Sequence, residues 1–82
     1  MHQKIMAMLQ EINPYVDIDM ETQLLEEEIL DSMELLLLVT QLEETYHIEI
    51  SLETIRADDF ETIDRIVSFT KKVISEQEKQ GH

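Results

Sequence analysis

The chain has 82 residues, of which 19 are Asp or Glu and six are Lys or Arg, so its formal net charge is -13. A hydrophobic content of 43% is too high for a disordered acidic tail, while one Gly and one Pro are too few for the tight turns of an all-β fold. The absence of Cys excludes disulfides, thiolate metal sites and thiol nucleophiles encoded in the chain.

The first predicted element is a helix over residues 2–13, which Asn13-Pro14 ends. Its apolar residues follow the i, i+3, i+4, i+7 spacing of one helix face: Ile5, Met8, Leu9 and Ile12. Residues 15–30 then form a long loop, because their apolar residues have no steady period. We predict that the apolar side chains of this loop anchor it to the core: Tyr15, Val16, Ile18, Met20, Leu24, Leu25, Ile29 and Leu30.

A second helix is predicted from Ser32 to about Tyr46. Asp31 is placed to act as its N-cap and Glu34 as its third residue, in a variant of the capping box, and the positive helix end favours both acids. One apolar stripe predicts the side that faces the core: Leu35, Leu38, Val39, Leu42 and Tyr46.

The remainder of the chain predicts two more helices. Residues 47–50 alternate as a short extended link, and Ser51 is a candidate N-cap for a short third helix near residues 52–57. A fourth helix begins at Glu61 or Thr62, with Lys71 and Lys72 near its negative end. Its core stripe consists of Ile63, Ile66, Val67, Thr70 and Ile74. The predicted fold is all-α, a small four-helix bundle with a long loop between the first two helices.

We expect a single domain over residues 1–80 that is a cytoplasmic monomer. The N-terminal apolar run is too short for a secretory signal, and no segment approaches the roughly 20 apolar residues of a membrane span. Gly81-His82 is interpreted as a remnant of an affinity tag. Because no Lys or Arg lies between Lys4 and Arg56, this interval should repel nucleic acid and attract basic protein surfaces.

The run Leu35–Val39 contains more aliphatic residues than a one-sided helix needs. Leu36 and Leu37 fall outside the core stripe, and Leu37 shares a second face with Met33, Thr40 and Glu44. Two interpretations are open. Either the helix is buried all round, or this face is an exposed docking strip with acids nearby to steer a basic partner: Glu34, Glu43 and Glu44.

Ser32 is a residue type that often caps helices, but Asp31 is positioned to cap instead. The Ser32 hydroxyl is then free to point outward at the positive helix end, where an attached phosphate would be stabilised. In this setting the segment LLEEEILDSMELLLLVTQLEETYHIEIS, followed by DDFETIDRIVSF, resembles the acyl and peptidyl carrier proteins. These are small four-helix domains whose Asp-Ser-Leu or Asp-Ser-Met motif opens the second helix, and the resemblance spans essentially the whole chain.

The resemblance implies that a phosphopantetheinyl transferase, with magnesium and coenzyme A, attaches 4'-phosphopantetheine to Ser32, and that Asp31 helps to position the reaction. The thiol of this arm would carry acyl or aminoacyl groups as thioesters from an activating ligase to downstream transferases or synthases. Partners would dock beside the arm on Met33, Glu34, Leu36, Leu37, Thr40, Glu43 and Glu44. The chain itself would be no enzyme and would need neither catalytic residues nor metal ligands.

Two departures from the family pattern bear on the cargo. Many carriers of fatty-acid synthesis have Gly or Ala before the Asp and an acid at the position of Leu37, whereas this chain has Leu30 and an aliphatic run. Its Leu-Asp-Ser-Met resembles the D-alanyl carriers and the stand-alone carriers of peptide synthetases. We therefore expect an aminoacyl or specialised acyl cargo rather than intermediates of housekeeping fatty-acid synthesis.

Three other interpretations of the sequence are possible. A non-carrying acidic adaptor would use the same helix face for protein binding alone. A calcium loop would use the EF-hand positions of Asp17, Asp19, Glu21, Gln23 and Glu28, but Thr22 occupies the position of its Gly. A hydrolase with Ser32 as nucleophile lacks both a G-x-S-x-G elbow and a neighbouring base.

Tyr15 and Tyr46 are predicted as core aromatics rather than as a platform that stacks nucleic-acid bases, because no basic groove accompanies them.

Overall fold

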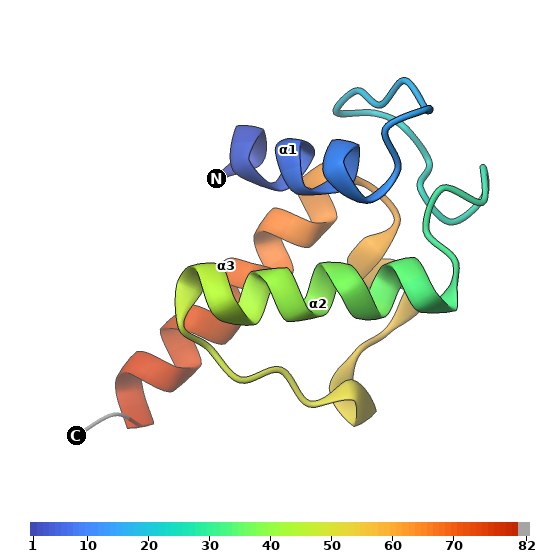
Figure 1. Ribbon diagram of the computed structural model, residues 1–82. Helices are drawn as coiled ribbons and strands as arrows, with labels where there is room; N and C mark the ends of the chain where they lie inside the picture. Colours follow the sequence, from blue (N-terminus) through green and yellow to red (C-terminus); the bar gives the residue numbers. More distant parts are fainter. Residues whose placement is uncertain (81–82) are drawn as a thin grey trace.

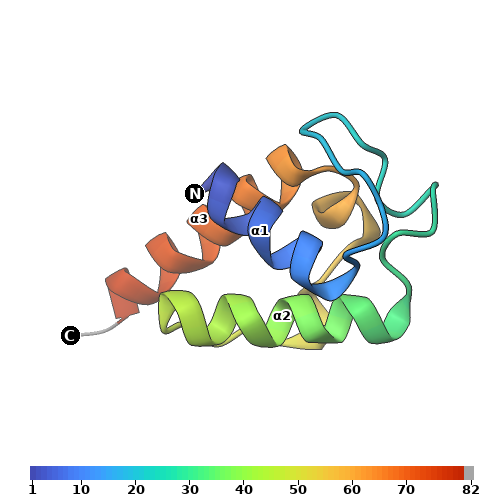
Figure 2. The same cartoon turned by 45° about the horizontal axis from the view of Figure 1, so that its top comes forward.

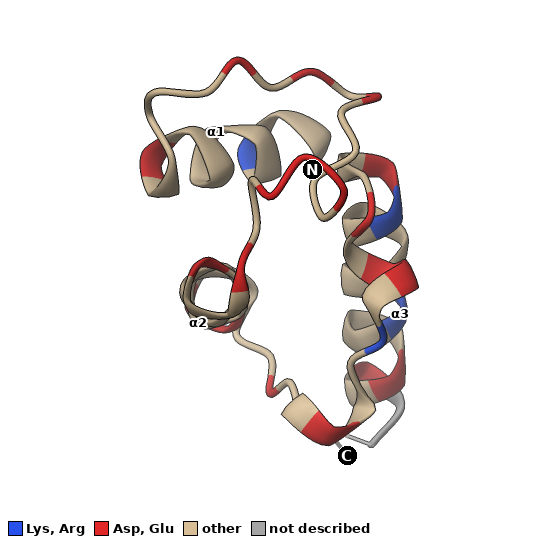
Figure 3. Ribbon diagram, turned by 90° about the vertical axis from the view of Figure 1, so that its right-hand side faces the viewer, with Lys and Arg blue, Asp and Glu red and all other residues tan. Residues whose placement is uncertain are grey.

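A computed structural model describes residues 1–80, within which the chain forms three α-helices and two short 3₁₀-helices (Figure 1). In chain order these are α1 (His2–Ile12), α2 (Ser32–Tyr46), η1 (Leu52–Thr54), η2 (Ala57–Phe60) and α3 (Ile63–Gln80). α1 contacts both α2 and α3, and η2 contacts α3. Viewed along α2, the three helices surround one interior (Figure 3). The predicted all-α fold is confirmed, while Gly81-His82 lies outside the described residues.

One hydrophobic core joins all three helices, the loop and η2. The predicted core stripes of the three helices supply most of it, and its fully buried members include Ile5, Leu9, Leu24, Leu38, Leu42, Phe60, Ile63 and Ile66. The Phe60 ring also packs on Phe69, with 5.2 Å between the ring centroids. Within residues 1–80 no helix is both long enough and apolar enough to cross a membrane.

The loop between α1 and α2 is anchored at Leu24, which is fully buried. The Leu24 backbone N–H donates to the Glu61 carbonyl at 2.8 Å, and the Leu24 carbonyl accepts from the N–H groups of Ile29 and Leu30 at 2.9 and 3.0 Å. The loop therefore inserts Leu24 into the core, while its backbone passes on the outside of the helices to the start of α2 (Figure 2). Ile18 is buried as predicted.

The prediction that Tyr15 is a core aromatic is wrong, because 96% of this residue is exposed. The Val16 N–H donates to the Asn13 carbonyl at 3.4 Å, which closes a turn with Pro14 and Tyr15 at its corners. Corner residues of such a turn project away from the chain that they reverse. Tyr46, in contrast, is half-buried at the end of α2, and burial raises the pKa of its phenol.

The short third helix predicted near residues 52–57 does not form, so the fold has no fourth α-helix within residues 1–80. η1 stops at Thr54, whose hydroxyl donates to the Ser51 carbonyl at 2.8 Å. The β-branched Ile55 and the following Arg56 are extended, and a new turn, η2, begins where Asp59 Oδ2 accepts from the Arg56 N–H at 3.3 Å. β-branching and local side-chain bonds both disfavour a continuous helix here.

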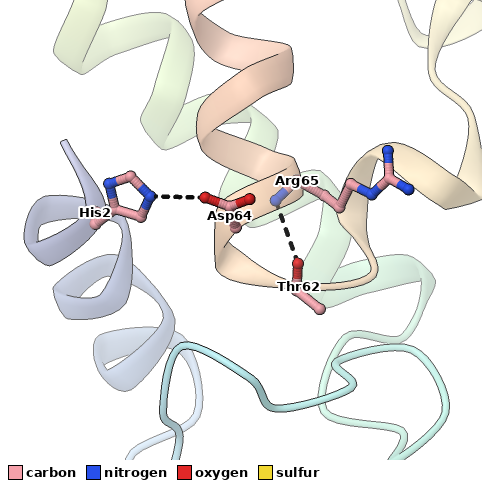
Figure 4. Close-up of polar contacts among 4 residues, drawn as sticks. All are labelled: His2, Thr62, Asp64 and Arg65. Carbon is pink, nitrogen blue, oxygen red and sulfur yellow. Dashed lines mark hydrogen bonds and ion pairs between the residues drawn. The ribbon is translucent and has the colours of Figure 1, made fainter.

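α3 begins within a residue or two of the predicted position. The Thr62 hydroxyl accepts from the Arg65 N–H at 3.2 Å and so caps the first turn (Figure 4). His2 Nε2 lies 3.0 Å from Asp64 Oδ1, which ties the start of α1 to the start of α3 (Figure 4). This contact is the one ion pair found among the side chains that the structure describes.

α2 ends in a left-handed residue, His47, with φ 55° and ψ 50°. The backbone N–H groups of His47 and Ile48 both donate to the Glu43 carbonyl. The chain then continues through the extended link, in which Ile48 and Ile50 are buried. A residue with a Cβ is strained in this region, whereas Gly is not.

We therefore expect His47→Gly to raise the free energy of unfolding by about 1 kcal/mol, because it relieves the left-handed strain at the end of α2. Urea unfolding followed by circular dichroism measures this change. The control is Glu44→Gly on the exposed face of the helix interior, which should lower stability by about 0.5 kcal/mol. Destabilisation by both variants would contradict the left-handed end.

Candidate functional site

Ser32 is the first residue of α2 and is exposed. Asp31 Oδ1 accepts from the Glu34 N–H at 2.9 Å, so the predicted N-cap is confirmed and the cap belongs to Asp31. Within residues 1–80 the Ser32 hydroxyl makes no hydrogen bond to the protein. The hydroxyl is therefore available at the end of α2 where backbone N–H groups and the helix dipole favour negative charge.

Glu34 does not complete the predicted capping box. Its Oε2 instead accepts from Asn13 Nδ2 at 3.0 Å, and the same amide group lies 3.4 Å from the Ile29 carbonyl. Asn13, just past the end of α1, offers Glu34 a side-chain donor, and the carboxylate turns to it rather than back to the N-cap. The start of α2 is thus tied to the end of α1, a long-range contact that no local pattern predicted.

The outer face of α2 is apolar and open to solvent near Ser32. Met33 is 71% exposed, Leu36 48% and Leu37 49%, whereas Leu38, on the opposite side, is fully buried. Thr40 continues this face, and its hydroxyl donates to the Leu36 carbonyl at 3.0 Å. We call Met33, Leu36, Leu37 and Thr40 the apolar strip. Its exposure contradicts the interpretation in which α2 is buried all round.

The acids expected beside this strip differ in their surroundings. Glu44 is exposed, whereas Glu43 is half-buried and its Oε2 accepts from the Ile50 N–H at 2.9 Å. Glu43 therefore holds the link after α2, and Glu34 holds Asn13. Of the three acids, Glu44 alone has a carboxylate without an internal hydrogen bond within the described residues.

A groove of about 430 Å³ opens beside Ser32, between the first half of α2 and the η1–η2 segment. Its lining consists of Leu25, Ser32, Leu35, Leu36, Leu52, Ile55, Arg56, Ala57 and Phe60, and we call it the Ser32 groove. Sequence reasoning did not find this groove, because its walls come from four separate segments with no common spacing.

A second groove, of about 580 Å³, lies between residues 49–59 and α3, and we call it the α3 groove. Its charged lining residues are balanced in sign: Glu49, Arg56, Asp59, Arg65, Lys72 and Glu76. Ser51 and Ser68 also line it, whereas Ser32 does not. Arg56 borders both grooves.

The acidic loop does not group the residues that the alternative calcium loop would use. No three His, Asp or Glu side chains within the described residues are grouped so that they could hold a metal ion. Asp19 Oδ1 instead accepts from the Glu21 N–H at 2.9 Å and from the Thr22 hydroxyl at 3.0 Å, and these two bonds lower the pKa of the Asp19 carboxyl. The carboxylate thus stabilises a turn in its own loop.

Comparison with known families gives one finding. A family model described as a phosphopantetheine attachment site matches residues 3–70. Searches of curated proteins and of solved structures give no match. Members of the matched family carry 4'-phosphopantetheine covalently on a serine.

The residues around Ser32 fit the chemistry of this group. The hydroxyl is exposed, has no internal partner in the described part of the chain, and lies where a helix end favours a phosphate oxygen. The Ser32 groove and the apolar strip flank it with apolar surface that fits the uncharged remainder of the arm. When bound, the arm supplies the thiol that the chain lacks.

We expect Asp31→Ala to lower the free energy of unfolding by about 1 kcal/mol, because the Glu34 N–H loses its acceptor. Asp31→Asn keeps a side-chain oxygen and should stay within about 0.5 kcal/mol of the parent. Urea unfolding followed by circular dichroism compares the variants. An unchanged Asp31→Ala stability would show that the cap is absent in solution.

Proposed function

Because the chain belongs to the phosphopantetheine-binding family of acyl and peptidyl carrier proteins, we propose that Ser32 bears the arm and that the protein shuttles thioesters between partner enzymes. The matched range contains Ser32, Ser51 and Ser68. The observation that carries the choice of Ser32 is that Asp31 takes over the capping of α2 and leaves the serine hydroxyl exposed at the helix end.

The other two serines lack these surroundings. Ser51 precedes a 3₁₀-helix of three residues, and Ser68 lies within α3, where the backbone N–H groups are used by the helix. Neither borders the Ser32 groove. An anionic ester would therefore be stabilised at Ser32 and would lack comparable backbone donors at the other two positions.

The proposed loading reaction is a phosphoryl transfer from coenzyme A, catalysed by a phosphopantetheinyl transferase with magnesium. The Ser32 oxygen bonds to the phosphorus that bears pantetheine, the pyrophosphate P–O bond breaks, adenosine 3',5'-bisphosphate leaves, and the hydroxyl proton is lost. Asp31 supports the reaction by holding the first turn of α2, so that Ser32 stays at a defined position.

The cargo is proposed to be an aminoacyl or specialised acyl group. The support is local: Leu30 is buried directly before Asp31, and Leu37 is exposed where many carriers of fatty-acid synthesis have an acid. An activating ligase and downstream transferases or synthases would then recognise α2 mainly by apolar contact. We also propose that residues 1–80 act as a single cytoplasmic domain and as a monomer.

The apolar strip is proposed as the docking surface for these enzymes, with Glu44 as its charged margin. Met33 and Leu37 expose large apolar side chains within about a turn and a half of Ser32, where a partner that reaches Ser32 must approach. The same strip would serve an acidic adaptor without an arm, which is the competing function.

The deciding experiment is intact-protein mass spectrometry after incubation with coenzyme A, magnesium and a broad-specificity phosphopantetheinyl transferase. The parent should gain one phosphopantetheine, and Ser32→Ala should gain none. The matched controls Ser51→Ala and Ser68→Ala remove exposed serines elsewhere and should load like the parent. A folded parent, free of an arm beforehand, that gains no mass would favour the adaptor.

We expect Met33→Ala and Leu37→Ala each to lower kcat/KM for loading about fivefold, which corresponds to a loss of about 1 kcal/mol of contact with the transferase. Tyr15→Ala is the control, since it removes an exposed apolar side chain outside α2. Initial loading rates followed by mass spectrometry give the comparison. Equal rates for all three variants and the parent would exclude the strip as the transferase-docking surface.

A further inference from the structure

The Ser32 groove has one charged lining residue, Arg56. Seven of its nine lining residues are apolar, and the other two are Ser32 and Arg56. Arg56 lies in the extended stretch between η1 and η2, with φ -115° and ψ 147°, and is exposed. A single cation thus borders the same groove as the exposed hydroxyl at the start of α2.

Among the side chains that the structure describes, no acid forms an ion pair with the Arg56 guanidinium. The one ion pair among the described side chains joins His2 and Asp64. Two hydrogen bonds join Arg56 and Asp59, from the Arg56 backbone N–H to Asp59 Oδ2 at 3.3 Å and from the Asp59 N–H to the Arg56 carbonyl at 3.0 Å, and neither involves the guanidinium group. The guanidinium is therefore available to a ligand.

The surroundings of Ser32 are otherwise acidic. Thirteen of the 19 acids but only one of the six basic residues, Lys4, lie in residues 1–55. Asp31 directly precedes Ser32, and Glu34 lies two positions after it. A phosphodiester on Ser32 would add a negative charge to this region, and within the Ser32 groove Arg56 is the one cation that could offset it.

We propose that Arg56 pairs with the phosphodiester of the arm on Ser32 and holds the first part of the arm along the Ser32 groove. A guanidinium can donate two parallel hydrogen bonds to phosphate oxygens, which fixes orientation as well as charge. This inference rests on the proposed function, because it requires the arm on Ser32. Arg56 is then a positioning residue, which directs the arm toward η1 and η2 and leaves the apolar strip open to partners.

The test compares the loaded parent with loaded Arg56→Gln, Arg56→Lys and Arg65→Gln. Arg65 is the matched control, because it is an exposed arginine that borders the α3 groove and not the Ser32 groove. Intact mass first verifies that each protein carries one arm. Phosphorus NMR then reports the environment of the phosphodiester from low to high salt.

In the parent and in Arg65→Gln, the phosphorus resonance should move with added salt, because screening weakens an exposed ion pair. In Arg56→Gln it should already lie at the high-salt position and should not move. Arg56→Lys should respond to salt less than the parent, because it keeps the charge but loses the two-pronged geometry.

Thermal unfolding provides an independent readout. On addition of the arm, the Tm of Arg56→Gln should end about 1–5 °C lower, relative to its unloaded form, than the Tm of the parent does relative to its own unloaded form, the range expected for one exposed ion pair in a domain of this size. In Arg65→Gln the arm should change the Tm as it does in the parent.

The possible failures are distinguishable. If Arg56→Gln and Arg65→Gln behave alike in both measurements while all proteins load, the pairing is overturned and the carrier function stands. If the parent accepts no arm, both proposals are overturned together.

Discussion

Ser32 lies between two segments that the side-chain amide of Asn13 holds together. The loop over residues 13–31 has no regular structure and would by itself leave the start of α2 undefined. Asn13 Nδ2 lies 3.0 Å from Glu34 Oε2 and 3.4 Å from the Ile29 carbonyl, so it joins the end of α1 to both sides of the Asp31-Ser32 pair. Together with the Leu24 anchor, this contact turns a long loop into a defined support for the site.

Local signals in the sequence were enough to predict α1, α2 and α3 and the cap at Asp31, because apolar periodicity and capping act over a few residues. They failed after η1, where a bond between near neighbours, from the Arg56 N–H to Asp59 Oδ2, starts a new turn instead of continuing a helix. They also failed where distant residues compete, because the Glu34 carboxylate accepts from Asn13 Nδ2 instead of completing the capping box. The Ser32 groove was unpredictable for the same reason, since its walls are separated by up to 35 positions, from Leu25 to Phe60.

α2 presents two different surfaces that meet at its first residues. Leu36 belongs both to the apolar strip and to the wall of the Ser32 groove, so the two surfaces are continuous. Under the proposed function, an arm lying in the groove and a partner docked on the strip would touch across this residue. Arg56 would then influence partner encounters indirectly, because it would determine whether the arm lies in the Ser32 groove or over the apolar strip, on the other side of Leu36.

The contact between Gln77 and Glu49 bears on how this protein can be divided. The Gln77 side-chain amide bonds both the N–H and the carbonyl of Glu49, and so fastens the link after α2 to the later turns of α3. The family match stops at residue 70, before this fastening. A module excised at that boundary for fusion to another protein would keep the family signature. It would also lose the hydrogen bonds from Gln77 that fix Glu49, in the segment that leads into η1. The wall of the Ser32 groove that η1 forms would then be less rigid.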